Sequence, residues 1–123
     1  MNTKTLNIGV TSLDEGLAQF AKVWKDASAG KRIKSYAGIG FATGVELLTT
    51  LTSRRFELIN ALKGMGAVSI YALAKHLGRN YSNVHGDIGK LLELGIVEKD
   101  EKGRVFVPWD EIDVQLPLQR LAA

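Results

Sequence analysis

The chain has 123 residues, of which 46% are hydrophobic and 24% are charged, a composition typical of one compact domain or of a domain with a small appendage. It contains no cysteine, which excludes disulfides, thiolate metal sites and a cysteine nucleophile. The formal net charge is +3, and nine basic against six acidic side chains place positive charge between residues 53 and 104, which permits binding to a polyanion.

The N-terminal sequence contains no apolar block of signal-peptide length, and no window reaches the roughly 18 to 20 apolar residues that a membrane span needs. We therefore expect a cytoplasmic protein without a membrane partner. The alternation of Leu6, Ile8 and Val10 in "TLNIGV" predicts a short, half-buried strand.

A helix is predicted next, because Ser12 and Glu15 have the spacing of a capping box. Its apolar residues follow in steps of three and four, which makes a narrow seam (Leu13, Leu17, Phe20, Trp24 and Ala27). This seam packs either on its own domain or on a second subunit or another protein. The connector that follows is rich in glycine and lysine, with a strand expected near "YAGIGF"; its "GIGFATG" lacks the spacing of a phosphate-binding loop.

Three helices are predicted between residues 45 and 78. "VELLTTL" indicates a short one, and "SRRFELINALKGMG" a second that opens at Thr52 or Ser53 and ends at Gly64 or Gly66. In "SIYALAKHLG", Ser69 is the expected N-cap and Gly78 the end. The apolar residues between them recur at helical spacing and predict one buried face (Ile70, Leu73, Ala74 and Leu77).

The helix expected over 81–94 begins with residues that are poor helix formers, and it ends at Gly95. On a helical wheel the apolar side chains, Tyr81 included, fall within about 60° of the core direction. The opposite side is polar or small and collects Arg79, Ser82, Asn83, Gly86, Lys90 and Glu93. Short polar groups and a glycine at the front of an exposed face let a helix lie deep in a groove.

The sequence "IVEKDEKGRVFV" predicts two strands joined by a tight turn that ends at Gly103, and "DEIDVQLPL" predicts a last strand. Two helices, a turn, a further helix and a two-stranded wing follow one another in the order of a winged helix-turn-helix. We therefore expect a mainly α fold with a small β wing (α+β), divided into an N-terminal strand and helix extension over 1–42, for dimerisation or partner binding, and a winged helix-turn-helix domain over 43–123.

In such a fold the second helix of the motif enters the DNA major groove with its N-terminal residues against the base edges. Asn bonds adenine, Ser bonds a base or a phosphate, and Arg or Lys reads guanine or neutralises phosphate. The helix over 81–94 is thus the expected reader, and the wing over 96–107 is expected on the DNA backbone. The predicted DNA-binding residues are Arg79, Asn80, Ser82, Asn83, His85, Gly86, Lys90, Lys102 and Arg104.

Within this set, Ser82, Asn83 and Lys90 are expected on base edges. Arg79, Lys102 and Arg104 are expected on phosphates, and Gly86 allows close approach. We expect His85 to pack at the flank of the helix and to bond a backbone or phosphate group. Asp87 faces sideways, where it orients Arg79 or His85.

The segment from Phe41 to Leu116 resembles small prokaryotic winged helix-turn-helix transcriptional regulators related to the MarR type, in particular a group of antitoxin-like DNA-binding proteins. Their pattern L-A-x-x-L-G-R-[DN]-Y-x-N-V-H-x-D is matched from Leu73 to Asp87, L-x-x-L-G from Leu91 to Gly95, and V-P-[YW]-D from Val107 to Asp110. The resemblance implies a dimeric transcriptional regulator.

The chain departs from this pattern at two positions, because Ser82 and Gly86 stand where the pattern often has basic residues. Fewer phosphate contacts reduce both the affinity for DNA and its dependence on salt. We therefore expect modest non-specific binding.

The function expected from the sequence is a sequence-specific, homodimeric transcriptional regulator of double-stranded DNA. The alternative is an antitoxin-like interaction module whose N-terminal segment binds a toxin-like protein, with DNA binding secondary or lost. We expect no enzyme and no cofactor, because no nucleophile, base and orienting group converge. We expect no metal site either, since His76 and His85 have no second ligand at the required spacing.

Overall fold

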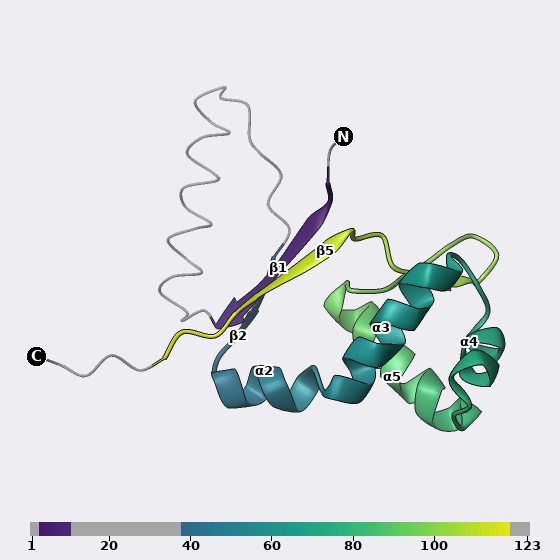
Figure 1. The fold of residues 1–123 in the computed structure, drawn as a ribbon, viewed down its shortest axis with the longest axis horizontal. Helices are drawn as coiled ribbons and strands as arrows, with labels where there is room; N and C mark the ends of the chain where they lie inside the picture. Colours follow the sequence, from purple (N-terminus) through teal and green to yellow (C-terminus); the bar gives the residue numbers. More distant parts are fainter. Residues whose placement is uncertain (1–2, 11–37, 119–123) are drawn as a thin grey trace, which may run out of the picture. The chain divides into compact units, whose positions relative to one another are not determined.

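The computed structural model describes residues 3–10 and 38–118, and within these ranges the chain is an α+β protein with four helices and five short strands (Figure 1). The chain divides into two compact units. One comprises residues 1–4 and 51–111, and the other residues 5–50 and 112–123. The predicted α+β class is confirmed.

The unit of residues 5–50 and 112–123 is built around a three-stranded sheet with the order β2-β1-β5. Strand β1 (Thr5–Val10) pairs in parallel with β2 (Gly38–Phe41), and Ile8 lies opposite Ile39. Leu6 and Ile8 are buried, as their alternation in the sequence predicts. The expected strands over 5–10 and near "YAGIGF" are therefore confirmed.

The last strand, β5 (Glu111–Gln115), is also confirmed, but its apolar residues are less buried than their alternation suggested. Val114 and Leu116 are 36% and 40% exposed. The same unit contains α2 (Gly44–Thr50), which the Thr43 hydroxyl caps by accepting from the Glu46 amide at 3.0 Å. The short helix predicted from "VELLTTL" is present.

The other unit contains three helices, and all their ends except the start of α5 have the expected caps. Helix α3 (Ser53–Met65) has Thr52 as its N-cap and Gly66 as its C-cap, and α4 (Ile70–Leu77) lies between Ser69 and Gly78. Helix α5 (Tyr81–Leu94) begins after Asn80 and ends at Gly95. Gly78 and Gly95 adopt the left-handed conformation, which glycine reaches without the steric cost that a Cβ imposes.

The core of this unit is formed where the apolar sides of the three helices meet. Leu58, Leu62, Leu73, Val84, Ile88 and Leu91 are each 0% exposed. Tyr81 differs from the prediction, because it is 48% exposed although the helical wheel pointed it toward the core. It is the first residue of α5, and its ring instead lies 5.8 Å from the ring of His85.

A hairpin follows α5. Strands β3 (Glu98–Lys99) and β4 (Val105–Phe106) pair antiparallel, and Gly103 completes the turn between them with φ of 78°. On its other side β4 is bonded to Val68, which exchanges two backbone hydrogen bonds of 3.1 and 2.8 Å with Val105. The predicted hairpin is confirmed, and it is tied to the segment that joins α3 to α4.

Two expectations from the sequence concern the N-terminal helix and the division into domains. The capping box of Ser12 and Glu15 and the seam of the helix that follows it lie outside the described residues. The division into an extension over 1–42 and a winged helix-turn-helix domain over 43–123 stays a prediction, and α2 belongs to the same compact unit as β1 and β2. In the described ranges, no helix combines the length and apolar character that a membrane crossing requires.

The conformations of Gly95 and Gly64 predict opposite effects of the same substitution. Gly95→Ala places a Cβ at φ of 79° and should destabilise the protein by about 1 kcal/mol or more. Gly64 lies within α3 with open space around the added Cβ, so Gly64→Ala should stabilise the protein by roughly 0.4 to 1 kcal/mol. Urea unfolding measures both, and shifts of the same sign would contradict the assigned conformations.

Candidate functional site

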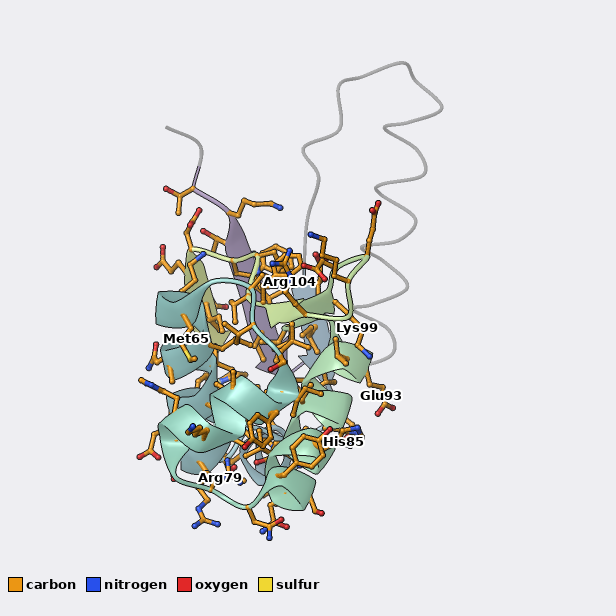
Figure 2. The ribbon with its side chains drawn as sticks, turned by 90° about the vertical axis from the view of Figure 1, so that its right-hand side faces the viewer. Met65, Arg79, His85, Glu93, Lys99 and Arg104 are labelled. Atoms are coloured by element: carbon orange, nitrogen blue, oxygen red, sulfur yellow. The ribbon has the colours of Figure 1, made fainter. Side chains whose placement is uncertain are left out.

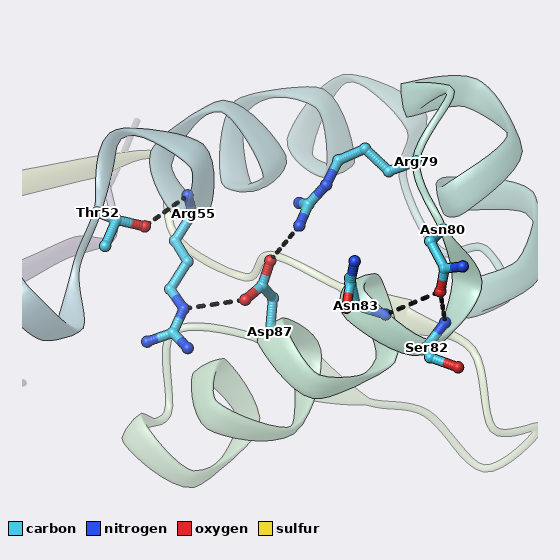
Figure 3. Close-up of polar contacts among 7 residues, drawn as sticks. All are labelled: Thr52, Arg55, Arg79, Asn80, Ser82, Asn83 and Asp87. Atoms are coloured by element: carbon cyan, nitrogen blue, oxygen red, sulfur yellow. Dashed lines mark hydrogen bonds and ion pairs between the residues drawn. The ribbon is translucent and has the colours of Figure 1, made fainter.

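The start of α5 is held by the side chain of Asn80. Its Oδ1 accepts hydrogen bonds from the Ser82 and Asn83 backbone N–H groups, with donor–acceptor distances of 2.8 and 3.4 Å (Figure 3). The first N–H groups of a helix have no acceptor within the helix, so the Asn80 side chain supplies the acceptor for two of them. Asn80 therefore has a structural role at the beginning of α5, and its Oδ1 is already engaged.

The N-terminal half of α5 presents small and polar groups away from the core. Ser82, Asn83, His85 and Gly86 are exposed, whereas Val84 on the other side of the helix is completely buried. A Cβ added at Gly86 would meet nothing within 4 Å. Packing in the described part of the chain therefore does not require a glycine here, although glycine lowers the stability of a helix.

The hairpin that follows α5 in the chain adds basic side chains. The side chains of Lys102 and Arg104 are exposed, and Figure 2 shows His85 and Glu93 on α5, and then Lys99 on the hairpin, one after another along one edge of the view. Lys90 lies 3.8 Å from Glu93, its neighbour one helical turn further along. Such partly exposed pairs contribute little to stability and can exchange for other partners.

Asp87 receives two arginines from different parts of the chain. Its Oδ1 lies 3.2 Å from Arg55 Nε at the start of α3, and its Oδ2 lies 2.7 Å from Arg79 Nη2 in the turn before α5 (Figure 3). The predicted orienting role of Asp87 toward Arg79 is confirmed by this bond. The side chain of Arg79 is only 17% exposed, which leaves little of its surface for a phosphate.

Asp100 organises the hairpin turn. Its Oδ1 accepts from the backbone N–H groups of Lys102 and Arg104, and its Oδ2 accepts from Arg104 Nε at 2.8 Å. Desolvation alone would raise the pKa of the Asp100 carboxyl, but the bonds from Arg104 and Lys102 together lower it below its ordinary value. The guanidinium of Arg104 is thus held at a defined position on the turn.

The motif from Val107 to Asp110 connects the end of the hairpin to two helices. Trp109 Nε1 donates to the carbonyl of Gly95 at the end of α5. Lys63 of α3 reaches the Val107 carbonyl at 3.4 Å and Asp110 at 3.5 Å. Trp109 therefore serves the fold rather than a base, and the motif fixes the segment after the hairpin against α3 and α5.

Lys4 completes this contact from the N-terminal side. Its backbone N–H donates to Asp110 Oδ2 at 2.9 Å, and its Nζ lies 5.8 Å from the ring centroid of Trp109. The hydrogen bond from the Lys4 backbone, and then the charge of Lys63, lower the pKa of the Asp110 carboxyl against the opposing effect of desolvation.

The structure brings most of the predicted residues onto one element. Those from Asn80 to Lys90 lie on α5 or at its start, Arg79 lies in the preceding turn, and Lys102 and Arg104 lie on the hairpin. Sequence reasoning missed Arg55 as a partner of Asp87, because the two residues are 32 positions apart and no local spacing relates them. Across the described residues, no group of three or more His, Cys, Asp or Glu could hold a metal ion.

Comparison with known proteins gives one finding. The model of the HVO_A0114 family matches residues 50–114, which include α3, α4, α5 and the hairpin. No curated protein and no solved structure matches the chain.

The lowered pKa of Asp100 predicts a pH-dependent contribution to stability. Because the pKa is lower in the folded than in the unfolded chain, the contribution is fully present above the ordinary value of 3.8 and is lost as the pH falls through the folded pKa. Asp100→Asn should therefore be less stable than the wild type at about pH 7, with a smaller difference at about pH 2.5. Urea unfolding at both pH values tests this, and a difference that grows on acidification would refute it.

Proposed function

The chain belongs to the HVO_A0114 family, and we propose that the segment shared with that family is a winged helix-turn-helix, related to the MarR type, that binds double-stranded DNA as a sequence-specific transcriptional regulator. The support is the succession of α3, α4, a turn, α5 and the β3–β4 hairpin within one compact unit. In this motif α5 enters the major groove and the hairpin contacts the backbone beside it.

One observation carries the proposal. The buried side of α5 is apolar and completely covered, while its N-terminal half presents Ser82, Asn83 and Gly86 outward. A helix that faced only solvent would gain stability from alanine or charged residues at these positions. Small groups on an exposed helix face favour close approach to a second surface, and amide and hydroxyl groups match the hydrogen-bonding edges of bases.

The contacts divide between bases and phosphates. We assign Ser82, Asn83 and Lys90 to base edges and Lys102 and Arg104 to phosphates, with His85 at the flank of the helix. Arg79 is bound to Asp87 and mostly buried, so the proposal no longer depends on it for a phosphate contact. Two copies of the chain would read half-sites about one helical turn of DNA apart, which requires a homodimer.

A protein-interaction role is the second candidate. Val45 and Leu48 of α2 are 76% and 56% exposed, and Leu118 is 89% exposed in the same unit. Val45 and Leu48 are three residues apart and therefore share one face of α2, and exposed apolar side chains that share a face favour protein contacts. Deleting residues 1–35 would abolish partner capture in an antitoxin-like module, whereas a regulator would lose dimerisation at most.

The first test is a salt series of binding to the DNA upstream of the chain's own gene against a scrambled duplex. We expect a preference of about 10³-fold or more for the native duplex. Asn83→Ala should weaken binding by about 1 to 3 kcal/mol at one position of the site, and the double variant with Lys90→Ala should lose the preference. Equal weak binding of both duplexes by all forms would refute the regulator function.

The second test uses Gly86→Ala, for which stability and binding should change in opposite directions. The added methyl meets nothing in the described structure and should stabilise α5 by about 0.5 to 1 kcal/mol. On DNA the same methyl should cost about 1 kcal/mol or more, because a close contact has no room for it. Gly64→Ala in α3 is the matched control, with stabilisation and unchanged binding; unchanged binding by Gly86→Ala would remove α5 from the interface.

A further inference from the structure

The cluster of Arg55, Asp87 and Arg79 joins three parts of the chain at one carboxylate. Arg55 comes from the first turns of α3, Arg79 from the turn before α5, and Asp87 from the middle of α5. Each carboxylate oxygen takes one guanidinium, as Figure 3 shows. Because the three side chains are only 22%, 17% and 17% exposed, solvent screens these interactions less than it screens surface ion pairs.

The geometry restricts how α5 can turn relative to α3. Asp87 lies on the flank of α5, one residue before the buried Ile88 and one turn after the exposed Asn83. A rotation of α5 about its axis would separate Asp87 from Arg55 or from Arg79, since these approach from different elements. Apolar packing alone tolerates small sliding and rotation, whereas two directional bonds from different elements do not.

The cluster also reduces the positive charge that the two arginines present to solvent. Two arginines and one aspartate leave a net charge of +1, so one cation is neutralised within the cluster. Arg79 depends strongly on Asp87, because its Nη1 is buried without a hydrogen-bond partner among the described residues. If the carboxylate lost its charge, the Arg79 guanidinium would be left partly buried without a counterion, and moving outward to solvent would relieve that cost.

We infer that Asp87 is a positioning residue for sequence discrimination: through Arg55 and Arg79 it fixes the orientation of α5 and holds both cations away from DNA. This inference deepens the proposed function and rests on it for the DNA consequence. Sequence preference is a ratio of specific to non-specific affinity, so a device that orients the reading face and limits free positive charge raises that ratio from both sides.

The test compares Asp87→Asn with Glu57→Gln. Both substitutions remove one negative charge and retain nearly the same side-chain size, but Glu57 is an exposed residue of α3 outside the cluster. For Asp87→Asn we expect tighter binding to a scrambled duplex and a salt dependence steeper by about one to two units of slope. The preference for the native duplex should fall by about tenfold. Glu57→Gln should change neither quantity.

A second measurement needs no DNA. Amide hydrogen exchange of α5 and of the first turn of α3 should become about tenfold faster in Asp87→Asn but not in Glu57→Gln, because α5 is no longer fixed. Unchanged exchange, or an unchanged preference and salt slope, overturns the inference. If the wild type itself binds no DNA, the proposed function fails, and the exchange result alone then upholds or overturns the positioning role.

A conservative variant covers the case in which Asp87→Asn does not fold. Arg79→Lys retains the charge but loses the Nη2 donor that meets Asp87. We expect a lower preference for the native duplex with an unchanged salt slope, since the orientation is loosened while a counterion to Asp87 remains. A preference equal to that of the wild type would overturn the inference.

Discussion

The burial of one side of α5 is the constraint on which the rest of the structure depends. Val84, Ile88 and Leu91 are each completely buried, and they recur at steps of four and three along the helix. Once this stripe faces the core, helical periodicity fixes which residues of α5 face outward. Ser82, Asn83 and Gly86 are therefore exposed as a consequence of packing, and the candidate site is defined by the same periodicity that forms the core.

Polar contacts then hold each end of this helix. Asn80 satisfies the first N–H groups, and Trp109 binds the Gly95 carbonyl at the other end. Asp87 ties the middle of the helix to α3 and to the preceding turn. Packing of the stripe determines which side of α5 is inside, and these directional bonds determine how far it can slide or turn. A surface that reads another molecule by hydrogen bonds needs both kinds of restraint.

Several basic side chains in the unit that contains α3, α4 and α5 are paired with acidic side chains. Arg79 is paired with Asp87, Lys90 with Glu93 and Arg104 with Asp100. In these three pairs the positive charge of the basic side chain is held beside a carboxylate. For the proposed function this arrangement limits non-specific attraction to phosphate and leaves discrimination to the groups on α5.

The sequence by itself determined the helices, most of their caps and the hairpin turn, because these depend on neighbours within a few residues. Thr52 and Ser69 precede helical patterns, and Gly78, Gly95 and Gly103 end the segments that they follow. It also determined which face of α5 is polar, since helical periodicity is a local property. Tyr81 shows the limit of that reasoning. A helical wheel gives the direction of a side chain, but it does not say whether other residues cover that side chain at the end of a helix. Only the tertiary structure decided that Arg55 meets Asp87, that Val68 extends the hairpin and that Lys63 and Lys4 meet at Asp110. These contacts join residues far apart in the chain, and their partners are selected by how the helices pack, which no local spacing records.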